Sequence, residues 1–577
     1  MKKLENIQQN KLISSYGGVG SIIETNTNGA LLILPYDMWP CFKNDSWRQC
    51  RQITDTRLLE YVRSQGYQQL DRLIEIPTPD LRVRIYAANN ADRAQTVGAD
   101  FFPEWYWCPN CRRLHRFADW LERWDAEFPD DNNFNVNEPA CYHCSRRSER
   151  GNGIHRSKLQ QVRFVMVDML TGELTDIPFD KLWENAPLNG TWALSENETN
   201  AQLYYKTTDN NDGLSGIYIR RDEANGESRI IRMSQIDANY LIKPGEAADE
   251  MFDARPPVAY KMAMRGSQSI YLPNIVRSLY IPFNDQDQAA NTEEEMDIQE
   301  FRFLTNNNNY TNDRYVEGNL NLIAVRKNLE ILPRYISRIT ALERLKETSV
   351  LLSYSRLAKP NEQRRWYDVN TGTERNDMTP GCKKPFNNEN NLNWMPAVEA
   401  FGEGILFELN LNGINPNNRT VFAHTYCHIV MKEMEFQCGY PLTSLKEKIF
   451  IDNDNNTAGF LIYTIAGGEG SYGGLISLTD DGRIINLIER GAERAKHCTN
   501  DPICINDGNA HCFACLDLPE TSCHKFNQDL NRRIFLENFF PGNENEATEE
   551  NRDLTDDSDN GDNIDPDTGI TRGVSLA

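Results

Sequence analysis

Apolar and polar positions alternate in short runs over much of the first half of the chain. In residues 15–35 (SYGGVGSIIETNTNGALLILP) the alternation surrounds glycines and an Asn-Gly pair, which predicts a β-hairpin or small β unit. Residues 55–77 favour one or two short amphipathic helices broken near Gly66. Residues 160–235 contain β-branched and aromatic runs separated by Gly, Asn and Asp turns, which predict a β-rich middle.

The second half of the chain shows longer patterns. Residues 285–313 are acidic and then asparagine-rich, which predicts a surface insertion beside a domain border. Residues 316–357 favour helix, because Leu342, Leu345 and Leu352 fall roughly on one helical face. Further on, an amphipathic helix (TVFAHTYCHIVMKEMEFQCG), an apolar run and a second helix (GRIINLIERGAERAKH) indicate an α/β domain.

These patterns predict a mixed α/β, multidomain fold. A chain of 577 residues exceeds what one hydrophobic core usually supports. The expected parts are an N-terminal α+β region (1–100), a zinc-ribbon-like module with two CxxC motifs (101–165), a β-rich middle (166–290), a helical region with the acidic and asparagine-rich insertion (291–393), a C-terminal α/β zinc-binding domain (394–540) and an acidic disordered tail (541–577).

Charge changes the picture in two ways. The formal net charge of -23 argues at first sight against nucleic-acid binding, which needs a basic surface. Much of that charge, however, lies in residues 541–577, where acidic residues far outnumber Arg552 and Arg572. The N-terminus has no secretory apolar stretch and no run approaches the length of a membrane span, so we expect a cytoplasmic protein without membrane contact.

The strongest chemical signal is a pair of CxxC motifs, Cys108-Pro-Asn-Cys111 and Cys141-Tyr-His-Cys144. Four thiolates in this arrangement are typical of structural zinc. The alternative, thiol redox chemistry, needs one CxxC at the start of a helix in a thioredoxin-like context, which this pattern lacks.

A second cluster, KHCTNDPICINDGNAHCFACLDLPETSC, holds five cysteines where one zinc site needs four. We predict Cys504, Cys512, Cys515 and Cys523 as ligands, because the central CxxC is flanked by seven residues on each side. Cys498 or a nearby histidine is the alternative fourth ligand. Closed four-thiolate sites leave no coordination position for substrate, so both predicted zinc ions are structural.

Two histidines carry the only enzymatic hypothesis. His424 and His428 lie one helical turn apart and could chelate a metal, with Glu433 nearby, as in a metal-dependent hydrolase or nuclease. The pair lacks the glutamate of an HExxH motif, so a buried hydrogen-bonding role is the favoured interpretation. No Walker A lysine or two-metal acidic cluster is visible, so any ATP-driven work belongs to a partner.

Basic and aromatic residues surround the first CxxC pair and suggest a surface for phosphates and bases. The alternative is that these arginines pair with acids between the two motifs, such as Asp119, Glu122 and Asp130. The basic and aromatic residues are Arg112, Arg113, His115, Arg116, Arg146, Arg147, Arg150, Arg156, Lys158, Arg163, Trp105, Trp107 and Trp120.

Several segments resemble known sequences. WMPAVEAFGEGILFEL (394–409) and the run from AHTYCH to DPIC, HCFACLDLPETSC and Asn527 resemble a zinc-binding domain found at the ends of some bacterial helicases. NKLISSYGGVGSI, residues 265–283 and residues 344–356 resemble the stand-alone DrmB family.

The resemblance implies a role in the DISARM antiphage system, beside a DrmA-like helicase and ATPase, in recognising foreign DNA. It supplies zinc ligands at the C-terminal CxxC and no catalytic residue. We therefore expect a non-catalytic, DNA-binding accessory subunit; a zinc scaffold that binds only protein is the main alternative.

Overall fold

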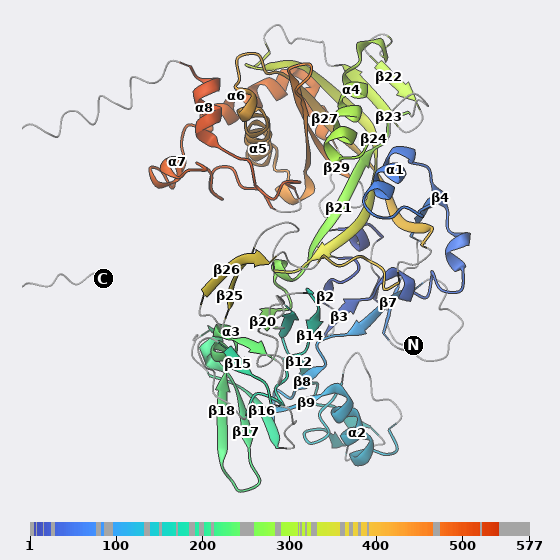
Figure 1. The fold of residues 1–577 in the computed structure, drawn as a ribbon, viewed down its shortest axis with the longest axis vertical. Helices are drawn as coiled ribbons and strands as arrows, with labels where there is room; N and C mark the ends of the chain where they lie inside the picture. Colours follow the sequence, from blue (N-terminus) through green and yellow to red (C-terminus); the bar gives the residue numbers. More distant parts are fainter. Residues whose placement is uncertain are drawn as a thin grey trace, which may run out of the picture.

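The computed structural model describes most of the chain, with gaps. The described residues are 5–6, 9–14, 17–24, 29–76, 82–85, 96–131, 139–148, 153–168, 171–183, 191–195, 201–208, 213–242, 259–282, 290–309, 311, 314–317, 320–324, 332–357, 364–368, 373–378, 382–388, 392–465, 474–519 and 522–541. The predicted acidic tail therefore lies, except for its first residue, outside the described residues. The predicted mixed α/β class is confirmed, since the described residues form many strands in several sheets and a smaller number of helices (Figure 1).

A large, mostly antiparallel sheet organises the upper part of the molecule in Figure 1. Its central pair is formed by two long strands, β24 (Ile336–Ser355) and β27 (Trp394–Asn410), which run antiparallel. The remaining strands are β22 (Arg314–Glu317), β23 (Leu320–Ala324), β29 (Thr457–Ile465), β28 (Lys446–Asp452), β21 (Leu272–Leu279), β5 (Arg72–Glu75) and β4 (Gln52–Ile53).

The helical prediction for residues 316–357 is wrong, because this stretch supplies β22, β23 and β24. The leucines that suggested a helical face, Leu342, Leu345 and Leu352, are all buried within β24. This strand is covered on both faces over much of its length, so its apolar residues do not alternate with polar ones. Such a buried strand is easily mistaken for a helix by periodicity.

The acidic stretch predicted as a surface insertion contains a packed helix, α4 (Glu293–Thr305). Thr292 caps it, its hydroxyl accepting from the amide of Glu295 at 3.1 Å, and the acids of the first turn suit the helix N-terminus. The other face buries Met296, Phe301 and Leu304. The acidic composition of this stretch therefore belongs to the solvated face of a packed helix.

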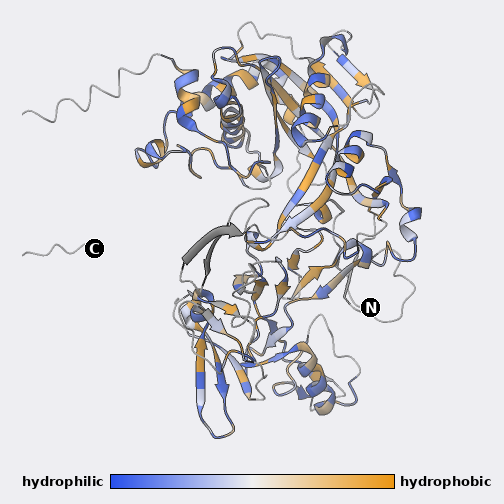
Figure 2. Cartoon of the chain, in the orientation of Figure 1, coloured by the Kyte–Doolittle hydropathy of each residue, from blue (hydrophilic) through white to orange (hydrophobic). Residues whose placement is uncertain are grey.

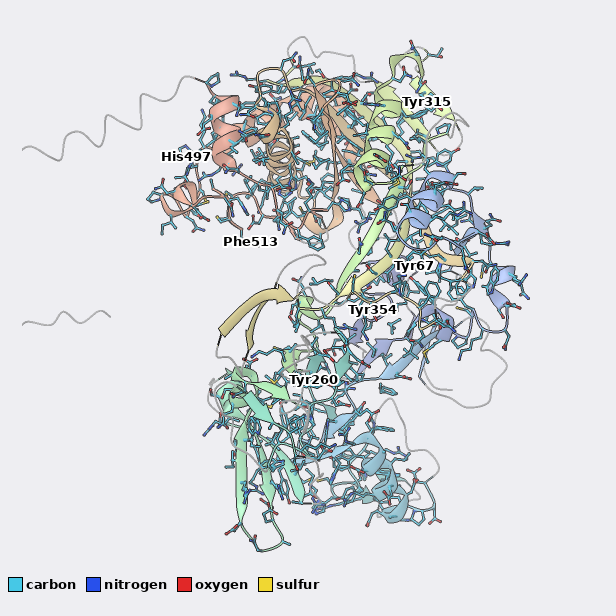
Figure 3. All side chains as sticks on the ribbon, viewed as in Figure 1. Tyr67, Tyr260, Tyr315, Tyr354, His497 and Phe513 are labelled. Carbon is cyan, nitrogen blue, oxygen red and sulfur yellow. The ribbon has the colours of Figure 1, made fainter. Side chains whose placement is uncertain are left out.

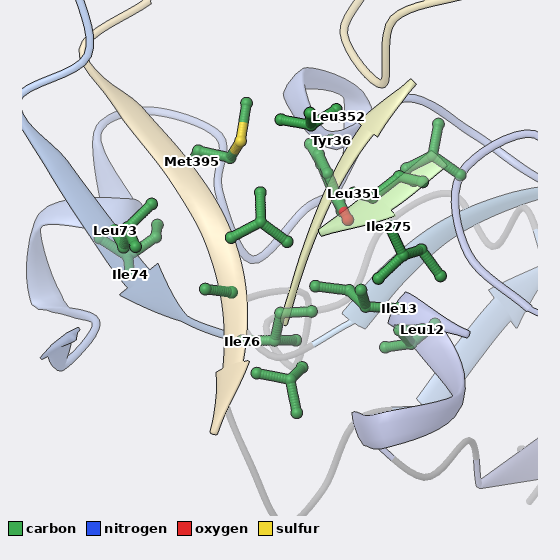
Figure 4. Packing of buried hydrophobic residues seen from close by; sticks show 14 of the residues in the cluster. Leu12, Ile13, Tyr36, Leu73, Ile74, Ile76, Ile275, Leu351, Leu352 and Met395 are labelled. Atoms are coloured by element: carbon green, nitrogen blue, oxygen red, sulfur yellow. The ribbon is translucent and has the colours of Figure 1, made fainter. Parts of the chain in front are cut away.

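Residues near the N-terminus share a core with the large sheet. The predicted hairpin is confirmed as β2 (Ile22–Glu24) and β3 (Ala30–Ile33), inside a five-stranded sheet with β1 (Glu5–Asn6), β6 (Arg82–Ile85) and β7 (Thr96–Phe101). The predicted break near Gly66 separates α1 (Thr56–Ser64) from β5, so the second half of that segment is a strand. Figure 4 shows Leu12, Leu73 and Ile275 among the residues of the shared core.

Arg356 joins three distant parts of the chain. Its buried guanidinium donates from Nε to the carbonyl of Gly172 at 2.8 Å, from Nη2 to that of Gly20 at 2.6 Å, and from Nη1 to that of Ile270. The same group lies over the ring of Tyr354, 5.1 Å from its centroid. The N-terminal region, the middle sheet and β24 are thus tied together by one side chain.

The β-rich middle is confirmed as two sheets around a common core. One contains β12 (Gln160–Gln161), β8 (Trp105–Trp107), β9 (Arg113–Arg116), β16 (Gln202–Thr207), β17 (Ile217–Asp222) and β18 (Ser228–Arg232). The other contains β14 (Leu174–Thr175), β13 (Phe164–Asp168), β20 (Ala259–Met264), β19 (Tyr240–Ile242) and β15 (Thr191–Ala193). The small helix α3 (Met233–Ala238) and the hairpins β10 (Arg146–Arg147) with β11 (Ile154–His155) and β25 (Arg364–Asp368) with β26 (Thr373–Met378) complete this part.

Helices cover one end of the large sheet, and the loops between them carry most of the C-terminal cysteines. The helix α5 (Arg419–Cys438) packs on β28 and β29 and ends at Gly439, whose φ of +70° suits a glycine C-cap. Against it lie α6 (Arg483–Arg494) and α8 (Arg532–Phe539), with α7 (Ile503–Asn506) between them in sequence. Figure 2 shows hydrophobic stretches along β27 and β29. Within the described residues, no helix has the length and apolar character of a membrane span.

Candidate metal centres

The first pair of CxxC motifs converges on one point. Cys108 and Cys111 lie in the turn between β8 and β9, where the amide of Cys108 donates to the carbonyl of Arg113 at 3.0 Å. Arg112 has a φ of +66°, and its amide donates to the carbonyl of Cys108 at 2.7 Å. The strand-to-strand turn thereby directs both thiols to the same side.

The second motif of this site approaches from a separate loop before β10. The Cys144 amide donates to Cys141 Sγ at 3.4 Å, and Cys111 Sγ lies 3.7 Å from Cys141 Sγ. Four sulfurs around a zinc ion at about 2.3 Å are separated by about 3.8 Å, whereas a disulfide needs about 2.05 Å. The predicted residues Cys108, Cys111, Cys141 and Cys144 are thus brought together at a spacing that could hold a metal ion, with all ligand atoms within 4.8 Å of one another.

The second cluster forms around α7 and the loop that follows it. Cys504 Sγ lies 3.7 Å from Cys515 Sγ, and Cys512 Sγ lies 3.8 Å from Cys515 Sγ. The fourth sulfur is that of Cys498, 3.5 Å from Cys512 Sγ. These four cysteines make a second group that could hold a metal ion.

Hydrogen bonds favour the thiolate form of one cysteine in this second group. Burial raises the pKa of the Cys512 thiol, but hydrogen bonds, chiefly from the Asn500 amide group and Cys498, outweigh burial and lower that pKa to about 6. Asn500 Nδ2 lies 3.3 Å from Cys512 Sγ. A thiol with this pKa is largely thiolate at neutral pH, the form that binds metals.

Cys523, the fourth ligand expected from spacing, lies elsewhere. Its sulfur is 3.4 Å from His424 Nε2, under helix α5, and it belongs to a different group of side chains from Cys504, Cys512 and Cys515. The loop after α7 turns back, so the symmetric spacing along the sequence does not correspond to a shared site. We therefore revise the proposed fourth ligand from Cys523 to Cys498, which was the alternative.

The hydrolase hypothesis finds little support in the surroundings of its residues. His424 and His428 are 0% exposed, so neither ring meets solvent. Glu433, the proposed acid, pairs with Arg494 at 2.7 Å and accepts from Gln437. The partners of the Glu433 carboxylate are thus Arg494 and Gln437, and not the two histidines.

The surface around the first cysteine cluster offers fewer side chains for nucleic-acid contact than its composition suggests. Trp105 and Trp120 are buried and cannot stack on a base from solvent. Arg116 pairs with Asp180 at 3.1 Å and Arg156 with Asp131 at 2.5 Å. The predicted base-stacking role of these two tryptophans is therefore wrong, because Trp105 packs in the core of the β-rich middle and Trp120 in the core around the cysteines. Trp107, the third tryptophan of the prediction, is half-buried.

Three of the described arginines of this surface, Arg146, Arg147 and Arg163, are exposed. Arg146 and Arg147 form β10 and are exposed. Arg147 contacts Asp130 at 3.6 Å across a solvated gap, with side chains 61% and 84% exposed. Exposed pairs of this kind contribute little to stability. Arg147 can therefore exchange that partner for a phosphate, and Arg146 beside it is exposed as well.

Part of the chain is similar to known proteins. Residues 8–271 match a family described as a domain of unknown function, DUF8724. DISARM protein DrmB of Bacillus paralicheniformis (strain ATCC 9945a / NCIMB 11709 / CD-2) is 30% identical over 246 residues, which cover 35% of this chain and 41% of that protein. The chain thus matches less than half the length of this curated relative.

One solved structure is also similar to part of the chain, the crystal structure of the DUF1998 helicase MrfA bound to DNA. The match has 13% sequence identity and covers 40% of this chain and 26% of the helicase chain. Its TM-score of 0.20 is too low to support an argument about fold. The DrmB match agrees with the resemblance stated from the sequence motifs, which is confirmed. Over these 246 residues, the chain is similar to DISARM protein DrmB.

Proposed function

We propose that this chain is a non-catalytic accessory subunit that binds a DrmA-like helicase and contacts DNA during recognition of foreign DNA in antiphage defence. The observation that carries the proposal is the 30% identity with DISARM protein DrmB. Since the match covers 41% of that relative, the role, the helicase and the DNA are all proposed by analogy.

The metal part of the proposal is structural zinc at both four-cysteine groups. Four thiolates select zinc over hard cations, and a closed tetrahedron supplies folding energy without an open position for substrate. The proposed ligands are Cys108, Cys111, Cys141 and Cys144 in one site and Cys498, Cys504, Cys512 and Cys515 in the other. Thiolate ligands suit the cytoplasm, where cysteines stay reduced.

The DNA part of the proposal rests on Arg146 and Arg147. Exposed guanidinium groups on a short hairpin beside a zinc site can bind phosphates and release counterions. The contact is with the backbone of the nucleic acid, because Trp105 and Trp120 are buried and the half-buried Trp107 already stacks on Tyr205. We expect little dependence on base sequence.

A second candidate function is a zinc scaffold that binds only protein. It is favoured by two apolar side chains exposed on the C-terminal cysteine segment, Ile503 (81% exposed) and Phe513 (76% exposed). Figure 3 labels Phe513 on this segment. Exposed apolar groups of this size are typical of a partner surface.

Crosslinking separates the two candidates. The purified complex of this chain with its helicase is irradiated on DNA carrying photoreactive backbone groups, and crosslinked peptides are identified by mass spectrometry. The accessory-subunit proposal predicts crosslinks at or beside the β10–β11 hairpin. Crosslinks confined to the helicase, in a stable complex, would favour the scaffold.

A further inference from the structure

A third group of metal-binding side chains lies beneath α5, apart from both four-cysteine groups. Its members are His424 and His428 of α5, Glu447 of β28 and Cys523 of the loop after α7, and their ligand atoms all lie within 4.8 Å of one another. All four side chains are buried, the least so Glu447 at 3% exposed. Three elements far apart in the sequence thus bring nitrogen, oxygen and sulfur ligands to one point.

The distances fit a shared tetrahedral ion. His424 Nε2 lies 2.9 Å from Glu447 Oε1, His428 Nε2 lies 3.1 Å from Glu447 Oε2, and Cys523 Sγ lies 3.4 Å from His424 Nε2. Ligands at zinc bond lengths would be about 3.3 Å apart for nitrogen and oxygen and about 3.6 Å apart for sulfur and nitrogen. The observed separations are slightly shorter, so a small outward movement would admit the ion.

One hydrogen bond fixes the tautomer of His428. Its Nδ1 lies 2.9 Å from the carbonyl oxygen of Leu516, and because a carbonyl only accepts, Nδ1 carries the proton. In a neutral ring Nε2 is then a bare lone pair that faces Glu447. Metal-ligating histidines commonly have such a carbonyl partner on their other nitrogen.

The arrangement is poorly satisfied by hydrogen bonds alone. Although His428 Nε2 and Glu447 Oε2 are 3.1 Å apart, neither atom has a hydrogen-bond partner among the described residues. Two acceptors that face each other in a buried site repel unless a cation lies between them. A divalent ion would satisfy both, and with a carboxylate and a thiolate as ligands the buried site would be neutral.

The surroundings hold the ligands in place and leave a route inward. The Glu447 amide donates to the Ser522 carbonyl at 3.2 Å, and the Asn527 amide donates to Cys523 Sγ at 3.1 Å, as suits a thiolate. Glu447 and Cys523 also line a cavity of about 490 Å³. An ion can therefore reach the site from this cavity.

We propose that His424, His428, Glu447 and Cys523 form a third zinc site, separate from the two four-cysteine sites. The mixed nitrogen, oxygen and sulfur set suits zinc, and four protein ligands leave no place for substrate. The ion would lock α5, β28 and the cysteine-rich loop together. This site goes beyond the proposed function, which requires neither the ion nor these residues.

The test is the zinc content of the full-length protein. The chain is produced with zinc in excess, washed with a mild chelator and analysed by native mass spectrometry and elemental analysis. We expect three zinc ions in the unaltered chain and two in His428→Ala. His524→Ala is the matched control and should keep three, because the His524 ring faces Glu293, 3.2 Å away, and not the site.

Zinc absorption spectroscopy gives a readout that does not depend on variants. Three zinc ions should show nitrogen or oxygen scatterers at about 2.0 Å beside sulfur at about 2.3 Å, whereas two four-cysteine sites alone should show only sulfur. Two zinc ions in the unaltered chain, or a sulfur-only spectrum, would overturn the proposal. So would a folded His428→Ala protein that keeps all three ions. If His428→Ala fails to fold, the count and spectrum of the unaltered chain decide.

Discussion

The sulfur of Cys498 lies 3.5 Å from that of Cys512, whereas Cys523 Sγ lies 3.4 Å from a histidine nitrogen. The five cysteines of the C-terminal segment are thus divided four and one. Any account of metal binding in this segment must treat Cys498 and Cys523 as members of different sites.

Cys498→Ser should lower the zinc content by one ion, because it removes a ligand from the second four-cysteine group. Cys498→Ser combined with Cys504→Ser should lose no more than the single variant, since both ligands serve one ion. Cys498→Ser combined with Cys523→Ser should lose two. Cys382→Ser is the control, because that exposed cysteine belongs to none of the groups found among the described residues. A double variant of Cys498 and Cys523 that loses one ion would contradict this division.

His115 should make the first cysteine module sensitive to acid. Burial, with Arg123 and Arg113 nearby, lowers the pKa of His115 from 6.5 to about 3. The folded chain therefore holds the neutral ring, and the contribution of His115 to stability is nearly constant above about pH 6.5 and falls as the pH drops from there toward 3. The cost is about 1.4 kcal/mol for each pH unit in that window.

The measurement compares unfolding of the unaltered chain and His115→Gln between pH 7.5 and 5.5 by a probe of the module's tryptophans. Acid release of metal affects both proteins equally, so the difference isolates the imidazole. The unaltered chain should lose about 1 kcal/mol more than the variant between pH 6.5 and 5.5, because the full slope is reached only well below the unfolded-state pKa of 6.5. Parallel profiles would show that His115 is protonated without cost.

Gly459→Ala should destabilise the large sheet and its contact with α4. A Cβ built at Gly459 in β29 would lie 2.5 Å from Phe301 Cε2 and 2.9 Å from the Phe407 carbonyl oxygen. Relieving this overlap moves backbone or a buried ring, at a cost of about 1–3 kcal/mol. Gly266→Ala is the matched control, since a Cβ there meets no atom within 4 Å. Equal melting temperatures for the two variants would refute the argument.

Arg146→Gln with Arg147→Gln should weaken DNA binding by the complex and reduce its salt dependence. Removing two phosphate contacts lowers the slope of log affinity against log salt by about two. Arg48→Gln with Arg51→Gln removes equal charge from the N-terminal region and should leave the slope nearly unchanged. An unaltered slope in the Arg146 and Arg147 variant would remove the hairpin from the DNA surface.

The sequence correctly predicted the features that depend only on residues close together in the chain. The CxxC turns of Cys108 and Cys141, the hairpin at residues 15–35 and the helix that ends at Gly439 depend on neighbours in the chain, and all three are present. The other features depend on packing between distant parts of the chain. The leucines of β24 fit one face of a helix in the sequence, whereas in the structure both faces of this strand are buried over much of its length.

Glu447 had no sequence signal at all, because no motif connects a strand glutamate with His424 and Cys523. Cys523 was assigned by symmetric spacing, yet the fold carries it under α5. Trp105 and Trp120 appeared suited to bases because aromatic residues among arginines are common in nucleic-acid sites. Both are buried, Trp105 in the core of the β-rich middle and Trp120 in the core around the first cysteine group.

The most direct test of the proposed function is the ATPase activity of the partner helicase on DNA, measured for the helicase alone, this chain alone and their purified complex over a salt series. We predict that this chain alone hydrolyses no ATP and that the complex binds DNA more tightly and shows a higher DNA-stimulated rate than the helicase alone. A complex whose DNA affinity and ATPase rate equal those of the helicase alone would contradict it.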